Sequence, residues 1–207
     1  MSRYYTADRR DLVDFLRPYG QLGMVLDIGC AGGRLGRQLL QTGLAERCDG
    51  IEPNAAAASQ AADSLHRIWV ADLEEAITGQ VPWTDYDLLI MADVLEHLID
   101  PWRVLAELHR RVRPGSRLLL SVPNVRHKSV VLPLLFRGRF DYADAGILDR
   151  THLHFFTRSS LLDAVGRAGW RVATIAPYIK PKYRRWWFPH RLLGEFLAVQ
   201  YFLLVEK

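Results

Sequence analysis

The sequence has few cysteines and no long hydrophobic run, and both scarcities narrow what the protein can be. Its 207 residues include only two cysteines, Cys30 and Cys48. Cys30 lies in a glycine-rich turn, so we expect neither a structural disulfide nor a cysteine-ligated zinc site, and a reducing compartment is the default. No apolar stretch approaches the roughly 20 residues of a membrane-spanning helix, and residues 1–8 lack the apolar segment of a signal peptide. We therefore expect a cytoplasmic protein.

A large excess of one charge is also absent. The formal net charge is +4, from 27 Lys and Arg against 23 Asp and Glu. This balance permits an anionic partner but does not require one. Hydrophobic residues make up 49% and charged residues 24%, which is an ordinary globular composition. With no internal repeat or low-complexity linker, we expect a single domain over residues 1–207.

Short apolar runs alternate with helical patterns over the first 122 residues. The runs predict five strands, at residues 24–28, 48–52, 67–71, 86–91 and 117–122. Such alternation predicts an α/β fold, a Rossmann-like and mostly parallel sheet with helices on both faces. Its ligands should lie beyond the carboxyl ends of the strands. Residues 123–150 show no clear period and are interpreted as an insertion or lid (123–157 in all) on the acceptor side, followed by a helix at 160–168 and closing strands at 170–175 and 200–205.

The first strand runs into a glycine-rich turn whose spacing excludes one common ligand. A dinucleotide turn of the form Gly-x-Gly-x-x-Gly starting at Gly29 needs glycines where Ala31 and Arg34 stand. An NAD-linked oxidoreductase is therefore disfavoured. The pattern acidic-x-Gly-x-Gly-x-Gly fits better, because Asp27, Gly29 and Gly33 match three of its four positions.

This pattern resembles motif I of the class I S-adenosylmethionine-dependent methyltransferases, with alanine in place of the middle glycine. The resemblance continues through residues 24–122. Glu52 stands where that family binds the ribose hydroxyls, and a carboxylate can accept two hydrogen bonds from a diol. Asp72 stands where the family reads the adenine amino group, and residues 93–98 match a segment common after the fourth strand. The resemblance implies a seven-stranded sheet with an antiparallel last strand and S-adenosyl-L-methionine as cofactor. The implied cofactor-binding residues are Asp27, Gly29, Cys30, Ala31, Gly33, Glu52, Pro53, Asp72, Leu73, Ala92, Asp93, Val94 and His97, with Tyr5 (or Tyr4) covering the ligand.

Four segments after the fifth strand resemble a narrower bacterial subgroup of methyltransferases. They cover residues 121–127, 138–142, 146–149 and 151–157. Members of this subgroup often occur near, or fused to, glycosyltransferases of surface-polysaccharide pathways. The resemblance implies O-methylation of a sugar in a surface glycan or its lipid-linked precursor. It also raises the prospect of a glycosyltransferase partner or of peripheral attachment to the inner membrane face.

Histidines are the natural candidates for a catalytic base. Methyl transfer to a hydroxyl requires removal of its proton, and histidine titrates in the useful range. The candidates are His127, His152 and His97, although His152 also fits a buried core histidine. At position 154 the relatives more often carry arginine, so His154 is not expected to be a family-wide functional residue. No carboxylate-rich cluster stands out, and the sequence predicts no metal site.

Residues 178–198 are interpreted as a basic, aromatic insertion. Within it, residues 180–191 hold five Lys or Arg, four aromatics and no acidic residue. Aromatic faces suit sugar rings and lipids, and arginine suits phosphates. Nucleic acid would fit as well, but the chain lacks an Asn-Pro-Pro-Tyr-like motif of base-amine methyltransferases, so we do not expect a nucleic-acid partner.

Two alternatives to a sugar methyltransferase stay open at this stage. The first is a small-molecule methyltransferase for a quinone-like or other aromatic acceptor, which would have an apolar acceptor pocket. The second is a binding protein that kept the fold and lost activity. The intact acidic positions argue against the second, although cofactor binding alone does not exclude it.

Overall fold

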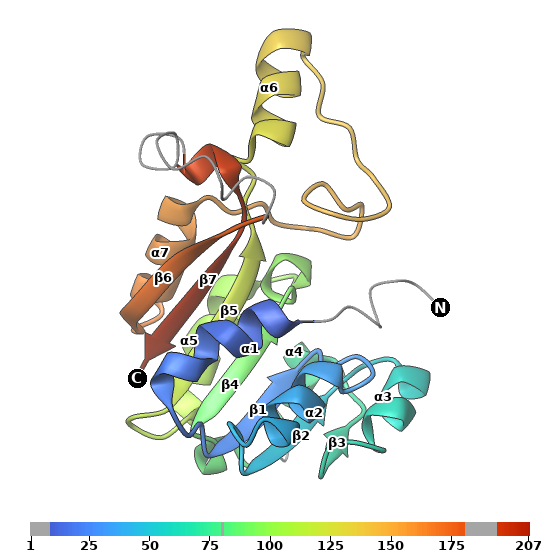
Figure 1. Ribbon diagram of the computed structural model, residues 1–207, viewed down its shortest axis with the longest axis vertical. Coiled ribbons are helices and arrows are strands. Elements are labelled where there is room, and N and C mark those ends of the chain that lie inside the picture. The colour runs from blue at the N-terminus through green and yellow to red at the C-terminus, as the bar shows by residue number, and fades with distance from the viewer. Residues whose placement is uncertain (1–8, 80, 181–193) are drawn as a thin grey trace.

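The computed structural model describes residues 9–79, 81–180 and 194–207. At its centre is a seven-stranded sheet of order β3-β2-β1-β4-β5-β7-β6 (Figure 1). The strands are β1 (Met24–Ile28), β2 (Arg47–Ile51), β3 (Ile68–Trp69), β4 (Leu88–Ala92), β5 (Arg117–Pro123), β6 (Arg171–Ile179) and β7 (Ala198–Glu206). The pairs among β1 to β5 are parallel, and β7 is antiparallel to both of its neighbours. The fold expected from the sequence is confirmed, including the antiparallel last strand.

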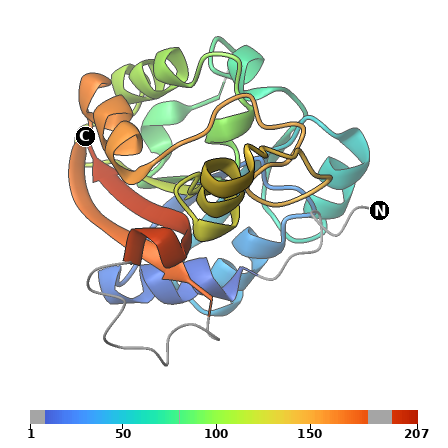
Figure 2. The ribbon, with the colours of Figure 1, turned by 90° about the horizontal axis from the view of Figure 1, so that it is seen from above.

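Helices cover both faces of the sheet (Figures 1 and 2). They are α1 (Arg10–Leu16), α2 (Arg34–Gln41), α3 (Ala55–Ala61), α4 (Leu73–Ala76), α5 (Pro101–Arg111), α6 (Lys128–Arg137) and α7 (Arg158–Arg167), with short 3-10 turns η2 (Arg17–Tyr19), η3 (Trp83–Asp85) and η4 (Leu95–His97). Two hydrophobic clusters result, one beneath α5 and α7 and one beneath α1 and α2. Strand β4 contributes side chains to both clusters, because alternate residues of a strand point to opposite faces of the sheet. Leu89 and Met91 belong to the first cluster, and Leu88 and Ile90 belong to the second.

The starts of two helices follow directly from local sequence. Asp100 accepts a hydrogen bond from the Arg103 amide at 2.9 Å, and Pro101 occupies the first helical position of α5. Helix α7 begins with a capping box between Thr157 and Ser160. These caps fix where the chain leaves the loops that surround the site.

The structure corrects two expectations. Strand β3 has only two residues rather than the five expected, because it is an edge strand that pairs with β2 through Ile68 and Trp69 alone. The segment 123–150 contains the helix α6, which the sequence pattern did not reveal. Within α6 only Val130 is buried, whereas Leu135 and Phe136 are 70% and 75% exposed. An apolar helix without a core-facing stripe has no amphipathic period to detect.

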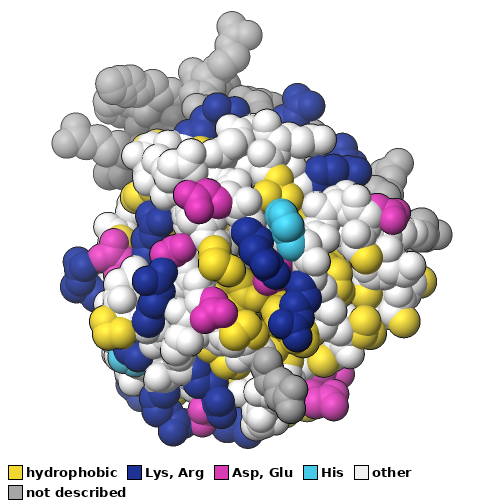
Figure 3. Space-filling model, turned by 90° about the horizontal axis from the view of Figure 1, so that it is seen from below, with side chains coloured by type: hydrophobic (Ala, Val, Ile, Leu, Met, Phe, Trp, Pro, Cys, Tyr) yellow, Lys and Arg dark blue, Asp and Glu magenta, His cyan; other side chains and the backbone are white. Residues whose placement is uncertain are grey.

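Helix α6 and the loop after it stand at the end of the molecule toward which β5 points (Figures 1 and 2). At the opposite end, shown in Figure 3, Lys and Arg side chains alternate with acidic ones around a hydrophobic patch. That face lacks the continuous basic surface typical of nucleic-acid binding. Among the described helices, none has the length and apolar character needed to cross a bilayer.

Candidate functional site

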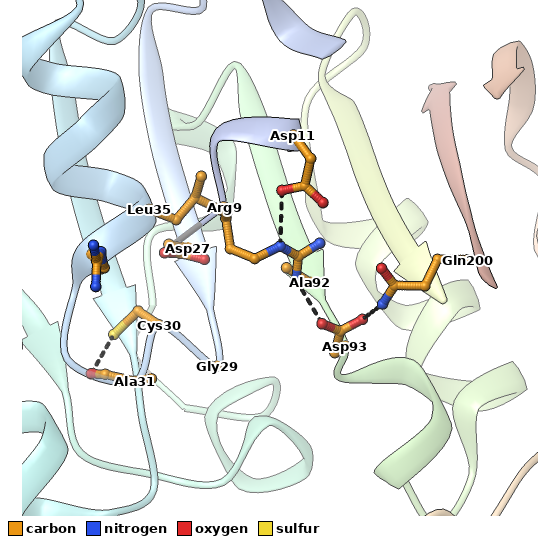
Figure 4. A pocket seen from close by; sticks show the side chains of 11 residues that line it. Arg9, Asp11, Asp27, Gly29, Cys30, Ala31, Leu35, Ala92, Asp93 and Gln200 are labelled. Carbon is orange, nitrogen blue, oxygen red and sulfur yellow. Dashed lines mark hydrogen bonds and ion pairs between the residues drawn. The ribbon is translucent and has the colours of Figure 1, made fainter. Parts of the chain in front are cut away.

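A cavity of about 270 Å³ opens beyond the carboxyl ends of β1 and β4. It is lined by the turn after β1 (Gly29, Cys30, Ala31), by Ala92 and Asp93 at the end of β4, and by Arg9 before α1 (Figure 4). This is the position expected for a ligand in an open α/β sheet.

The glycine-rich turn has the backbone geometry that explains its composition. Gly29 and Gly33 have φ values of 71° and 73°, in the left-handed region that favours glycine. A Cβ atom on Gly33 would lie 2.9 Å from Cα of Ala61, so the close approach of α3 also requires glycine there. Ala31 has φ of 47° and therefore adopts a conformation that costs a non-glycine residue about 1 kcal/mol.

Glu52 ties this turn to the end of β2. It is buried, and its two carboxylate oxygens accept hydrogen bonds from the Ala31 and Asn54 amides, each at 2.9 Å. An ionised carboxylate has about four acceptor sites, so both oxygens retain capacity toward a diol. The predicted ribose contact is compatible with this arrangement and stays a prediction.

Asp27 is a buried carboxyl group beside the cavity. It is 2% exposed at the end of β1, and burial raises its pKa to about 7. The cation nearest in effect is Arg9, which opposes that rise. A positively charged ligand group at this point would favour the carboxylate. The neighbouring thiols of Cys30 and Cys48 are free and buried, and burial raises the pKa of each, so the expected absence of a disulfide between them is confirmed.

Arg9 is the site residue that sequence reasoning missed. Its guanidinium contacts Asp93 Oδ2 at 2.6 Å and Asp11 Oδ1 at 3.2 Å (Figure 4). It also donates a hydrogen bond to Ser121 Oγ at 3.1 Å. Gln200, from β7, donates a hydrogen bond to the other oxygen of Asp93. Asp93 itself has φ of 57°, which aspartate tolerates better than most residues. No motif signals Arg9, because it stands in an ordinary charged run before α1.

The remaining predicted cofactor residues follow β2, β3 and β4. Asp72 directly precedes α4, where an aspartate often caps the helix. Its exposed side chain makes no capping hydrogen bond, so it does not serve as the N-cap here. Leu73 is buried and Pro53 is exposed. Val94 packs beneath the turn, since a Cβ on Gly29 would lie 2.6 Å from its Cγ2 atom. Tyr5, Tyr4 and residues 181–193 of the basic, aromatic insertion lie outside the described residues.

Two of the three candidate catalytic histidines come together. The rings of His97 and His152 meet edge to face with centroids 4.7 Å apart. Glu96 lies against them, 1% exposed, with Oε1 3.9 Å from His152 Nε2. Burial, together with the nearby Asp93 carboxylate, raises the pKa of Glu96. Asp93 links this cluster to the cavity, because it lines the cavity and its charge acts on Glu96, although none of the three clustered residues is part of the lining.

The third candidate, His127, and the neighbouring His154 have structural contacts instead. His127 caps α6 by accepting a hydrogen bond from the Ser129 amide through Nδ1, at 3.2 Å. A neutral ring in that role carries its proton on Nε2, which is a poor arrangement for a base. His154 Nε2 contacts the Ile99 carbonyl at 3.2 Å, and its ring packs on Trp102. The described contacts do not join His127 to the cluster, and its catalytic role stays a prediction.

Three aromatic side chains extend from the histidine cluster toward the lid. Phe155 lies 6.3 Å from the His152 ring, and Phe140 and Tyr142 pack on Phe155 at 5.4 Å and 6.2 Å between centroids. Tyr142 is 52% exposed. The acceptor side therefore offers aromatic faces beside imidazole groups.

The site suits the amino-acid portion of S-adenosylmethionine. The Arg9 cation can meet a carboxylate, and the buried Asp27 can meet an ammonium group, within one cavity. Glu52 and Asp72 continue the line of acidic residues along the carboxyl ends of β2 and β3, toward a nucleoside. The cavity thus offers charges of both signs to a zwitterion, whereas Glu52 and Asp72 lie outside its lining and their contact with a nucleoside stays a prediction.

Comparison with known proteins identifies the family of the chain. A family model described as a methyltransferase domain matches residues 1–175. Ubiquinone biosynthesis O-methyltransferase of Pseudomonas aeruginosa strain LESB58 is 31% identical over 136 residues, covering 57% of this chain and 56% of the relative. The ubiquinone biosynthesis O-methyltransferase of Burkholderia cenocepacia is 31% identical over 152 residues, covering 62% of this chain and 63% of the relative. The chain thus matches somewhat more than half the length of these relatives.

Solved structures share the fold over nearly the whole chain. An S-adenosylmethionine-dependent methyltransferase from Archaeoglobus fulgidus has a TM-score of 0.69 at 16% identity and covers 99% of this chain and 96% of its own. One from Mesorhizobium loti has a TM-score of 0.65 at 16% identity, with 94% and 96% covered. Since the family model spans most of the sequence, the chain belongs to the methyltransferase-domain family.

Proposed function

We propose that this enzyme methylates a hydroxyl oxygen of a small aromatic acceptor. The observation that carries the proposal is a chain of ring contacts from His97 through His152 and Phe155 to Phe140. Aromatic faces would hold a planar ring by stacking, while an imidazole beside it accepts the hydroxyl proton. This acceptor class was the first alternative to a sugar in the sequence interpretation.

His152 is the better placed of the two bases. Its Nδ1 lies 3.0 Å from the Ile147 carbonyl, which can only accept, so Nδ1 carries the proton and Nε2 presents a lone pair. Burial lowers the pKa of His152 and keeps the ring neutral. Glu96, 3.9 Å from Nε2, would stabilise the imidazolium once the ring takes up a proton.

The cofactor supplies a methyl group on a sulfonium, which is already an excellent leaving group. The protein's task is alignment and exclusion of water. Asp27 and Arg9 would hold the amino-acid end of the cofactor, and the aromatic side chains would position the acceptor. The new oxygen–carbon bond forms as the carbon–sulfur bond breaks, and the hydroxyl proton passes to His152.

Two further features support an aromatic acceptor over a sugar. The relatives named above are called ubiquinone biosynthesis O-methyltransferases, and a quinone-like acceptor belongs to the proposed class. In addition, α6 presents Leu135 and Phe136 to solvent on the acceptor side. A sugar acceptor and association with a glycosyltransferase stay predictions that rest on the sequence resemblance alone.

Methyl transfer from labelled S-adenosylmethionine tests the proposal. We expect product with catechol-type and quinol acceptors and none with nucleotide-linked or lipid-linked sugars. Glu52→Ala should abolish turnover by weakening cofactor binding, whereas the surface variant Glu107→Ala should not. His152→Asn should lower kcat by about 100-fold or more, as loss of a general base does, with His154→Asn as the matched control.

The outcomes separate the candidates. Product only with sugars would overturn the acceptor class while leaving the methyltransferase intact. Tight cofactor binding without turnover on either panel would favour the binding protein that lost activity.

A further inference from the structure

Glu96, His97 and His152 form a compact group of potential metal ligands. Each offers one ligand atom, and the three atoms lie within 4.8 Å of one another. We propose that these three side chains bind a divalent transition-metal ion, Zn²⁺ being the first candidate. This departs from the expectation drawn from the sequence, in which no metal site was visible because His152 lies far along the chain from the other two.

The Glu96 carboxylate is the strongest single observation. It is 1% exposed, and neither of its oxygens has a hydrogen-bond partner among the described residues. A buried carboxylate without partners is costly unless an opposite charge compensates it. Arg9 satisfies Asp93 nearby, but no described cation makes an ion pair with Glu96 other than the weakly basic His152. An ion held between Glu96 and the two imidazoles would supply that charge.

The histidine rings are oriented as in metal sites. His152 Nδ1 lies 3.0 Å from the Ile147 carbonyl, and His97 Nδ1 lies 3.1 Å from the Thr151 carbonyl. Carbonyl oxygens cannot donate, so each neutral ring has its proton on Nδ1 and its lone pair on Nε2. A backbone carbonyl behind the ring is the usual second partner of a metal-bound histidine, because it fixes both tautomer and orientation.

The backbone holds the two halves of the group together. The Glu96 carbonyl accepts hydrogen bonds from the Leu153 and His154 amides at 2.9 Å and 3.1 Å. Asp149 in turn accepts from the Thr151 amide and hydroxyl at 2.9 Å and 2.7 Å. The segment that carries His152 is therefore anchored directly to η4, so the three ligands are placed before any ion arrives.

The separation of Glu96 and His152 fits an ion better than a direct bond. At 3.9 Å, Oε1 and Nε2 are too far apart for a hydrogen bond. Two ligands at about 2.1 Å from a tetrahedral ion are separated by roughly 3.4 Å, so small side-chain shifts would complete the site. Two imidazoles and one carboxylate suit Zn²⁺ or another transition metal rather than Mg²⁺, which prefers oxygen ligands.

Three protein ligands leave at least one coordination position open. Because Glu96 follows Asp93, that position would lie beside the cofactor cavity, and an acceptor oxygen bound there would lose its proton more readily. This catalytic role rests on the proposed function and would replace His152 as the proton acceptor. Binding of the ion itself does not depend on which acceptor is used.

Metal binding by the full chain tests the inference directly. Chelator-treated protein would be titrated with Zn²⁺ against a chromophoric chelator, and bound metal counted by elemental analysis. We expect one ion per chain, and at least about tenfold weaker binding in Glu96→Gln and in His152→Asn. His109→Gln, which changes a histidine on α5 outside the group, should bind like the wild type.

A second readout guards against misfolding. Co²⁺ bound by the wild type should give visible absorption bands that both ligand variants lose, while calorimetry shows that they still bind S-adenosylmethionine. No stoichiometric ion in the wild type, or unchanged affinity in both variants, would overturn the inference. Neither result would bear on methyl transfer, since no acceptor is present in the assay.

Discussion

Removing the Arg9 side chain should destabilise the protein far more than removing a surface arginine. In Arg9→Ala, the Asp93 carboxylate loses its ion pair at 2.6 Å and Ser121 loses a hydrogen bond. Gln200 remains as a neutral donor to Asp93. The variant thus removes the arginine cation from a partly buried carboxylate that keeps hydrogen bonds from Gln200 and Ser121.

The size of the effect follows from burial. Breaking a fully buried pair by deleting one partner costs about 3–5 kcal/mol. The Arg9 and Asp93 side chains are 15% and 20% exposed, so water relieves part of that cost. We expect the free energy of unfolding to fall by about 2–3 kcal/mol at pH 8. The matched control Arg17→Ala breaks a pair whose side chains are 58% and 71% exposed, and should cost no more than about 0.5 kcal/mol.

The effect should also depend on pH with a definite sign. Burial raises the pKa of Asp93, and the Arg9 guanidinium opposes that rise. Without Arg9 the pKa of this carboxyl group rises further. The free-energy cost of deleting the arginine cation is therefore present above the pKa of Asp93 in the variant. It is lost as the pH falls below that pKa, because the Asp93 carboxyl group becomes neutral.

Urea denaturation of the wild type and both variants at pH 5 and pH 8 is the assay. The difference between wild type and Arg9→Ala should be larger at pH 8, while the Arg17→Ala difference stays small at both. Equal losses in the two variants, or an Arg9→Ala loss that grows toward pH 5, would refute the reasoning.

Three more predictions follow from particular residues. Ala31→Gly should change the free energy of unfolding by no more than about 1 kcal/mol. The glycine relieves the strain of the left-handed backbone conformation, but it also makes the unfolded chain more flexible, and the two effects oppose each other. A loss above about 2 kcal/mol in urea denaturation would contradict this prediction. Burial raises the pKa of Asp27 to about 7, so the contribution of this group to the free energy of unfolding falls as the pH rises from 4 to 7. Asp27→Asn should reduce this pH-dependent fall by roughly 2–4 kcal/mol. An unchanged pH profile of stability in the variant would contradict the prediction. The double change Leu135→Ser and Phe136→Ser on α6 should leave the free energy of unfolding within about 0.5 kcal/mol of the wild type. If α6 contacts a membrane, the same change should lower partition into lipid vesicles about tenfold, with Val70→Ser, 59% exposed, as the control. Equal vesicle binding by both variants would show that α6 is not a membrane contact.

Much of the cofactor site was predictable because it depends on local backbone. The turn after β1 requires residues in the left-handed conformation and a close approach of α3. Only glycine satisfies both requirements at Gly33, so the spacing of glycines in the sequence reveals the turn. The acidic residues at the ends of β1 and β2 follow strands that can be recognised by their apolar runs. Their common edge in a parallel sheet then brings Asp27 and Glu52 near the same turn.

Helix α6 and the length of β3 were not predictable in the same way. Sequence patterns report helices and strands through the face that they bury. Helix α6 buries little more than Val130, and β3 pairs along one short edge, so neither leaves a clear period.

The sequence by itself indicated the family, the alternation of strands and helices along the chain and the residues of the glycine turn, because each depends on patterns a few residues long. The tertiary structure alone decided that Arg9 and Gln200 meet at Asp93, and that His152 joins His97 while His127 caps a helix. Those contacts join segments far apart in the chain, and their geometry is set by how the loops pack over the sheet. Contacts of that kind leave no periodic trace in a single sequence.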